Sequence, residues 1–180
     1  MHASRRWLLI SGLGSFAVVA TGCMTKPLRP ANADGTYCHR AGRAYRPTWT
    51  CTPSAIPTLA AEEQAKRFTP DAAALTIYLV RKRWTDGLFP VRVATDGMSP
   101  ADLVPETFAR WRLRPGRHRL TLAWPDGTTE LEVSGSADEV LFVEVIGSAW
   151  AWGSTFRLEV GDTTDSRDRA GKLRLVADPA

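Results

Sequence analysis

The sequence predicts an all-β fold for residues 59–180, a small antiparallel β-sandwich or open barrel of seven to eight strands. Three observations support this prediction. Short segments rich in β-branched and aromatic residues follow one another, and most of them alternate apolar with polar side chains, which is the period of a strand. Turn residues separate the segments, as at Asp96–Gly97 and in the PDGT stretch at 125–128. No long amphipathic helical pattern competes with the strands.

The elements of this domain are expected in a simple order. A short helix at 59–68 comes first and ends before Pro70, because proline disfavours helical backbone in the residue before it. The first strand, LTIYLVRK, has apolar side chains on both faces, as a central strand would. Pro90 places the second strand near a sheet edge or limits its start. The eight strands are expected at 75–82, 89–95, 107–113, 117–124, 129–133, 139–147, 155–160 and 172–177.

The stretch WRLRPGRHRL, residues 111–120, combines five cationic or titratable side chains with a strand-like alternation. We expect the stretch 114–116 to form a hairpin turn between two neighbouring strands. Alternate residues of the two strands are expected to face the core. One of them, His118, is expected to be a partly buried, hydrogen-bonded structural histidine and not a catalytic base. That core-facing set is Trp111, Leu113, His118 and Leu120.

The opposite face of the same hairpin is a predicted contact surface. Antiparallel pairing would bring its like charges close together, at a cost of a few tenths of a kcal/mol per pair. An anionic partner would relieve this repulsion, whether it offers acidic protein side chains, lipid headgroups or lipopolysaccharide phosphate. The candidate partner-binding residues on this face are Arg110, Arg112, Arg117 and Arg119.

The first 22 residues have the pattern of an export signal, with Arg5 and Arg6 followed by an uncharged apolar run. The residues that follow, Ala-Thr-Gly-Cys at 20–23, resemble the lipobox of bacterial lipoproteins, in which the cysteine is acylated and becomes the new N-terminus. We therefore expect lipidation at Cys23, including palmitate, and a protein tethered to the outer membrane and facing the periplasm. Met24 supports the outer membrane, since the sorting rule of such lipoproteins associates Asp there with inner-membrane retention. An ordinary signal peptide, export by either the general or the twin-arginine route, and a domain that faces the cell exterior instead of the periplasm remain open alternatives.

The charge of the processed chain argues against nucleic acid as a partner. Removal of the signal leaves 21 Lys and Arg against 19 Asp and Glu, a formal charge of only +2. A nucleic-acid-binding domain would be expected to carry a much stronger positive field.

Residues 23–58 are expected to form a lipid-anchored tether of irregular or extended backbone. Five prolines and the absence of a sustained period support this. Cys38 and Cys51 lie within it, and two cysteines left over in an oxidising compartment most simply form a disulfide. A metal site that uses Cys38, His39 and Cys51 is the alternative, although zinc usually takes four ligands.

Several motifs also resemble a known family. They are IYLVR at 77–81, the Asp96–Gly97 turn, LRPGRHRL at 113–120 and the VLFVEV strand. Together they are similar to landmarks of a proteobacterial envelope lipoprotein family known as domain of unknown function 2846, over roughly residues 62–178. The resemblance implies a lipid-anchored protein with a β-rich domain, and it implies no catalytic residue.

The sequence contains no convincing catalytic constellation, so no catalytic residue, metal or cofactor is predicted, and a hydrolase is the least favoured class. Trp150 and Trp152 stand two apart at the end of a strand, where they could stack on sugar rings of peptidoglycan or lipopolysaccharide. The alternative is that both fill the core. The leading hypothesis is a non-enzymatic, lipid-anchored cell-envelope protein that acts as a protein-interaction or structural module, and a glycan-binding module is the second.

Overall fold

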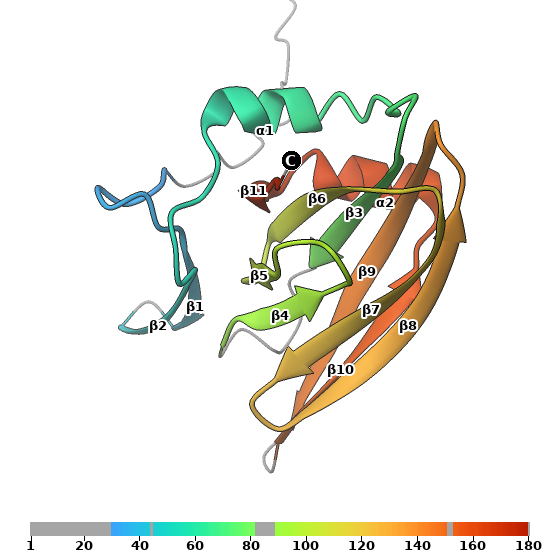
Figure 1. The fold of residues 1–180 in the computed structure, drawn as a ribbon. Coiled ribbons are helices and arrows are strands. Elements are labelled where there is room, and N and C mark those ends of the chain that lie inside the picture. The colour runs from blue at the N-terminus through green and yellow to red at the C-terminus, as the bar shows by residue number, and fades with distance from the viewer. Residues whose placement is uncertain (1–29, 44, 82–88, 151–152, 180) are drawn as a thin grey trace, which may run out of the picture.

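The structure is a computed structural model that describes residues 30–43, 45–81, 89–150 and 153–179. Two β-sheets pack face to face, and a two-stranded sheet stands outside them (Figure 1). The elements in chain order are β1 (Cys38–Arg43), β2 (Arg46–Cys51), α1 (Leu59–Ala65), β3 (Leu75–Arg81), β4 (Val91–Ala94), β5 (Ala101–Leu103), β6 (Thr107–Leu113), β7 (Gly116–Trp124), β8 (Gly127–Gly135), β9 (Glu139–Trp150), β10 (Gly153–Val160), α2 (Thr163–Ala170) and β11 (Arg174–Ala177).

The predicted β-sandwich is confirmed, but among the described residues its two sheets hold nine strands, not seven to eight, and the sandwich is not wholly antiparallel. One sheet has five strands in the order β10-β9-β3-β6-β11, and the other has four in the order β5-β4-β7-β8. The larger sheet is mixed, because β3 pairs antiparallel with β6 but parallel with β9, and β11 pairs parallel with β6. The excursion through the second sheet supplies the long connection that a parallel pair needs. The alternation of apolar and polar residues within a strand does not reveal whether the strand pairs parallel or antiparallel with its neighbours.

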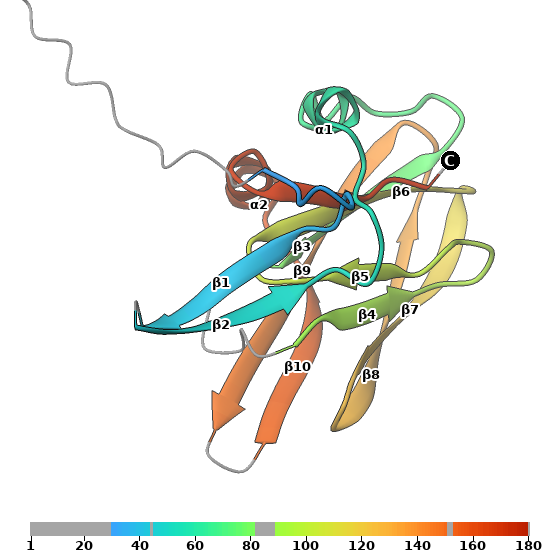
Figure 2. The same ribbon diagram turned by 90° about the vertical axis from the view of Figure 1, so that its left-hand side faces the viewer.

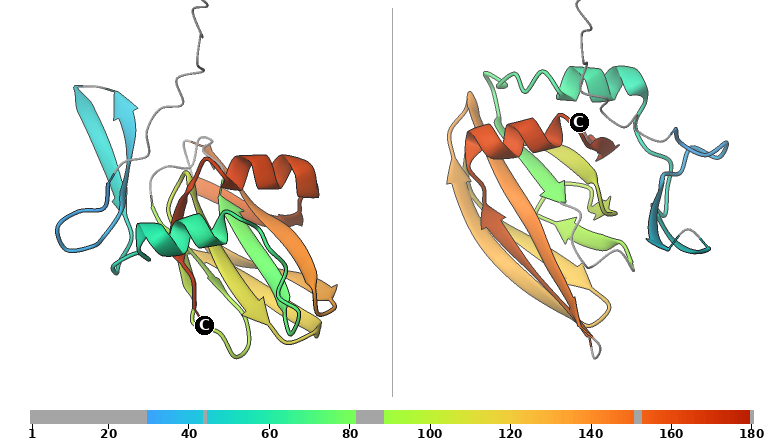
Figure 3. Two further views of the ribbon diagram at one scale, coloured as in Figure 1. Left: turned by 90° about the horizontal axis from the view of Figure 1, so that it is seen from above. Right: turned by 180° about the vertical axis from the view of Figure 1, so that it is seen from behind.

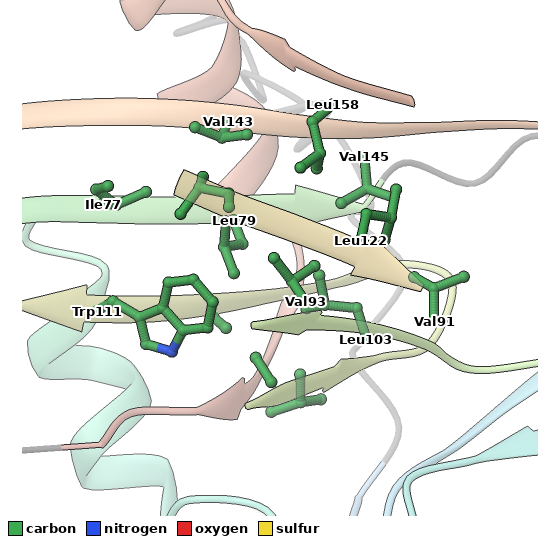
Figure 4. Close-up of a cluster of buried hydrophobic side chains, with 14 of the residues drawn as sticks. Ile77, Leu79, Val91, Val93, Leu103, Trp111, Leu122, Val143, Val145 and Leu158 are labelled. Atoms are coloured by element: carbon green, nitrogen blue, oxygen red, sulfur yellow. The ribbon is translucent and has the colours of Figure 1, made fainter. Parts of the chain in front are cut away.

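The core lies between the two sheets. Leu79 of β3 and Leu122 of β7 come from opposite sheets and point into the same space (Figure 4). The other side of β3 is also covered, because Tyr78 and Val80 pack in a second cluster with Ala170 of α2. Both helices therefore lie on the outer face of the five-stranded sheet (Figure 3). This double cover explains why every residue of β3 is buried, as the apolar pattern on both of its faces predicts.

The two helices have different sequence signals. The predicted helix at 59–68 is present as α1, where the Thr58 side chain caps the first turn by accepting a hydrogen bond from the Ala61 amide. The sequence reasoning missed α2. Its Asp162 side chain caps the first turn in the same way, but the helix buries only Ser166 and Ala170 and so lacks an apolar period of 3.6.

The predicted hairpin at 114–116 is wrong. Leu113 ends β6 in the five-stranded sheet, and Gly116 begins β7 in the four-stranded sheet, so the chain crosses from one sheet to the other here. β6 pairs with β3 and β11, whereas β7 pairs with β4 and β8. A tight turn within a hairpin and a tight turn that leads from one sheet to the other can have the same local sequence. Only the long-range partners distinguish a hairpin from a corner of the sandwich.

The predicted irregular tether is also wrong for much of its length. Residues 38–51 form the antiparallel β1–β2 hairpin, and Tyr37 is buried in the main core cluster. The backbone of Tyr37 is held at both ends, since its carbonyl accepts from the Thr52 amide at 2.9 Å and its amide donates to the Thr52 hydroxyl at 3.0 Å. The expected Cys38–Cys51 disulfide is present. Among the described residues, no helix has both the length and the apolar character needed to cross a bilayer.

Candidate interaction surfaces

The β1–β2 hairpin is the first candidate surface, and its base is fixed in three ways. The disulfide joins Cys38 to Cys51, which also face each other in the strand register. His39 and its partner Thr50 are buried on the side that faces the body of the protein. The His39 Nδ1 atom lies 3.4 Å from Oε2 of Glu106, a residue of the turn before β6. The hairpin is therefore a preformed element and not a loose loop.

Large side chains are exposed on this hairpin. Trp49 is 48% exposed and lies directly opposite the exposed Arg40 in the register, and Tyr45 near the tip is 70% exposed. Arg46 is exposed beside Tyr45. Figure 2 shows the hairpin reaching outward past the strands of the sandwich. Two aromatic side chains exposed among arginines on one rigid element indicate a binding surface more strongly than a single exposed apolar residue would.

The four predicted partner-binding arginines do not share one face, which corrects the premise of that prediction. Arg110 and Arg112 lie on β6 in the five-stranded sheet, whereas Arg117 and Arg119 lie on β7 in the other. The repulsion expected between the two pairs therefore does not arise. Each pair has its own surroundings.

Arg110 and Arg112 share one carboxylate. Arg110 donates from Nε to Oδ1 of Asp178 at 2.8 Å and from Nη2 to Oδ2 at 2.6 Å, and Arg112 approaches Oδ1 at 3.3 Å. Burial alone would lower the pKa of the Arg110 guanidinium, but the hydrogen bonds and charge of Asp178, followed by those of Tyr78, outweigh it and raise the pKa. Arg110 is therefore an internal charge that joins the C-terminal end of the chain to β6.

The second pair lies in solvent. The Arg119 guanidinium is 3.7 Å from the Glu130 carboxylate and 3.4 Å from that of Glu132, and all three side chains are more than half exposed. Glu132 is the register partner of Arg119 on β8. Arg117 is exposed next to them. Whether any of the four arginines contacts a partner stays a prediction.

His118 is partly buried and hydrogen-bonded, as predicted. Its ring is half-buried, and Nε2 lies 2.7 Å from the main-chain carbonyl oxygen of Arg114. This contact holds the ring against the backbone at the sheet crossing. The histidine borders a cleft of about 450 Å³ lined by Asp96, Gly97, Met98, Arg112, Leu113, Arg114 and His118.

A second cleft, of about 520 Å³, lies beside the start of α1. Its polar wall is the buried Glu62 carboxylate, which lies 3.3 Å from Nε of Arg174, 2.6 Å from Nζ of Lys66 and 3.1 Å from the Leu175 amide that donates to it. These contacts connect α1 to β11. The cleft is lined by Pro30, Ala31, Gly35, Ile56, Pro57, Thr58, Leu59, Glu62 and Arg174.

A buried glutamate connects the other helix in a similar way. Glu144 of β9 accepts a hydrogen bond from the Ser166 hydroxyl at 2.8 Å and pairs with Arg169, both on α2. Buried carboxylates need such partners to remain charged. Glu144 and Glu62 were not singled out by sequence reasoning, because their partners lie far along the chain. Their contacts indicate that both hold the helices in place.

The remaining predicted sites can be placed only in part. In the part of the chain that the structure describes, no three His, Cys, Asp or Glu side chains gather closely enough to hold a metal ion, and the disulfide occupies both thiols of the alternative metal site. The backbone of Trp150 pairs with Gly153. The side chain of Trp150, all of Trp152, the signal and Cys23 lie outside the described residues. Glycan binding and lipidation stay predictions.

Comparison with known proteins found no match, either among protein-family models or among curated proteins. The resemblance to the envelope lipoprotein family therefore stays a prediction based on the motifs quoted above.

Proposed function

We propose that this protein is a non-enzymatic, lipid-anchored component of the bacterial cell envelope, and that it acts as an interaction or structural module. The proposal keeps the outer membrane, with the domain facing the periplasm, as the location. The observation that carries it is the Cys38–Cys51 disulfide at the base of a hairpin with exposed aromatic side chains. Disulfides persist in oxidising compartments such as the periplasm, which agrees with an export signal at the start of the sequence.

If Cys23 is acylated, the short chain between it and the folded hairpin would keep the domain near the anchor. Six residues separate Cys23 from Pro30, where the described chain begins. Even fully extended, that span reaches at most about 23 Å, at roughly 3.3 Å per residue. A free spacer up to Thr58 would reach on the order of 115 Å by the same measure. The protein therefore acts close to the membrane surface if Cys23 is acylated.

Labelling with palmitate tests the anchor. We expect the wild-type protein to incorporate labelled palmitate. After density centrifugation of lysed cells, we expect it in the outer-membrane fraction. Cys23→Ser should lose the label. The double variant Cys38→Ser with Cys51→Ser is the matched control, since it removes the other two cysteines and should keep the label. Label retained by Cys23→Ser, or absent from the wild type, would refute the anchor.

A further inference from the structure

We propose that the outer part of the β1–β2 hairpin seats on the anionic phospholipid headgroups of the membrane. Arg40 and Trp49 lie on one side of the ribbon, Arg46 lies on the other side, and Tyr45 lies near the tip. We call these four residues the hairpin patch. The patch would then be a second, non-covalent membrane contact beside the acyl chains. Its geometry uses the lipid anchor of the proposed function, but its affinity for headgroups is a property of the hairpin itself. The two can therefore be tested separately.

The chemistry of the patch fits a phospholipid surface. Between Cys38 and Cys51 the chain carries three arginines and no Asp or Glu. Arginine forms charge-assisted, two-pronged hydrogen bonds with phosphate oxygens. Tryptophan and tyrosine concentrate at membrane interfaces, because their rings are apolar and their polar atoms stay hydrated. Trp49 and Tyr45 are exposed by 48% and 70%, so both rings are accessible for such a contact.

Positive charge is concentrated in the N-terminal part of the sequence that would follow the anchor. Residues 24–51 contain five Lys and Arg against one Asp, whereas residues 52–180 contain 16 Lys and Arg against 18 Asp and Glu. An anionic leaflet attracts the first segment, and it does not attract the net-acidic remainder of the chain. The small net charge of the whole protein hides this polarity.

The placement of the hairpin favours a membrane over a soluble partner. Only six residues lie between Cys23 and Pro30. The chain already forms a turn at 32–36, in which the backbone N–H of Asn32 donates to the Thr36 carbonyl at 2.8 Å. An anchor this close raises the local concentration of the hairpin at the bilayer. The rigid hairpin base also lowers the entropic cost of binding, because the patch is already formed.

Vesicle sedimentation tests the patch without the acyl chains. The test protein is residues 24–180 with the disulfide intact, and its fold is retained because every buried apolar residue of the described core lies between Tyr37 and Val176. We expect it to sediment with vesicles of equal parts phosphatidylglycerol and phosphatidylcholine, and not with pure phosphatidylcholine. Added salt should weaken the binding, since ions screen exposed charges.

Variants identify the residues. Each arginine near an anionic surface contributes about 5-fold in affinity, so Arg40→Ser with Arg46→Ser should weaken binding about 30-fold. The single variant Trp49→Ser should also weaken vesicle binding but should keep the preference for anionic vesicles. The control Arg114→Ser with Arg157→Ser removes the same charge from exposed positions of the sandwich and should bind as the wild type does. Equal urea midpoints would show that all variants are folded.

Three outcomes would overturn the inference. They are equal binding to both vesicle types, equal losses in the patch and control variants, and sedimentation with purified peptidoglycan sacculi but not with vesicles. Each of these leaves the palmitate result unaffected. Conversely, absence of palmitate label from the wild type would refute the anchor. Vesicle binding by residues 24–180 could still be measured.

Discussion

Asp178→Asn removes the countercharge of a buried arginine, and we expect it to lower the free energy of unfolding by about 3 kcal/mol. The Asp178 carboxylate is 11% exposed, and the Arg110 side chain that binds both of its oxygens is 6% exposed. Water therefore has little access to the Arg110 guanidinium and would solvate it poorly once the carboxylate charge is lost. Breaking a buried pair by removing one partner costs about 3–5 kcal/mol, and the lower value applies because asparagine keeps one acceptor oxygen.

The effect should be visible in two measurements. For a domain of this size, 3 kcal/mol corresponds to a fall of about 6–12 °C in Tm. Urea unfolding followed by tryptophan fluorescence gives the free energy directly, since Trp111, the residue after Arg110 in β6, is fully buried in the core between the sheets. The slope against urea should stay unchanged if the native state keeps its compactness.

An exposed pair provides the matched control. Arg119→Ser removes an arginine whose partners Glu130 and Glu132 lie in solvent, so it should cost less than about 1 kcal/mol. Replacing both members of the buried pair, Arg110→Met with Asp178→Leu, should recover part of the loss. A change below 1 kcal/mol for Asp178→Asn, or one equal to that of Arg119→Ser, would refute the reasoning that Arg110 depends on this carboxylate.

Three further predictions concern the disulfide, a buried tyrosine and a crowded glycine. Replacing Cys38 and Cys51 by serine should lower the urea-derived free energy of unfolding by about 3 kcal/mol in the chain-entropy model, and hairpin cleavage by trypsin no faster than in the wild type would contradict the proposed local constraint. Burial raises the pKa of the Tyr78 hydroxyl, so the folded state holds a proton that the unfolded chain releases, and stability should fall as the pH rises above about 10. Tyr78→Phe should flatten this dependence of Tm on pH, and an equally steep curve would contradict it. Gly161→Ala should cost about 1–3 kcal/mol in thermal unfolding, because its Cβ would collide with the Ser166 hydroxyl, and an unchanged Tm would show that α2 can move aside.

Strands that cross the core were predictable from their own residues. In β3 both faces are apolar because one faces the second sheet and the other faces the helices, and this appears directly as LTIYLVR. In β7 only one face is buried, and Leu120 and Leu122 alternate with exposed or half-buried neighbours. Local burial leaves a local pattern, which is why these segments could be assigned without a structure.

Elements outside the core left weaker signals. β5 has only three residues, too few to show a period. Trp49 and Arg46 of the β1–β2 hairpin are exposed, so its sequence lacks the apolar stripe of a core strand. The hairpin is held instead by a disulfide and by Tyr37, which precedes β1. In α2 the cap at Asp162 was the available signal, but the helix itself is polar.

The candidate site was less predictable than the fold, because sequence does not reveal which sheet a strand joins. Arg110 and Asp178 are 68 positions apart, and their contact requires β11 to lie beside β6. The arginine face was therefore inferred from a hairpin that does not exist. The exposure of Trp49 and Tyr45 likewise depends on where the hairpin docks, which follows from Tyr37, His39 and their distant partners.

The parallel pairing of β3 has a consequence for the order in which the protein can fold. Leu75 at the start of β3 lies opposite Glu139 of β9, and Thr107 of β6 lies opposite Arg174 of β11. Contacts between such distant residues slow folding, because a long loop must close before they form. Until β9 and β11 are present, the apolar strands β3 and β6 keep open edges that can pair with other chains. The five-stranded sheet can therefore close only when nearly the whole chain is available, so a chain that stops before residue 139 should aggregate instead of folding in part.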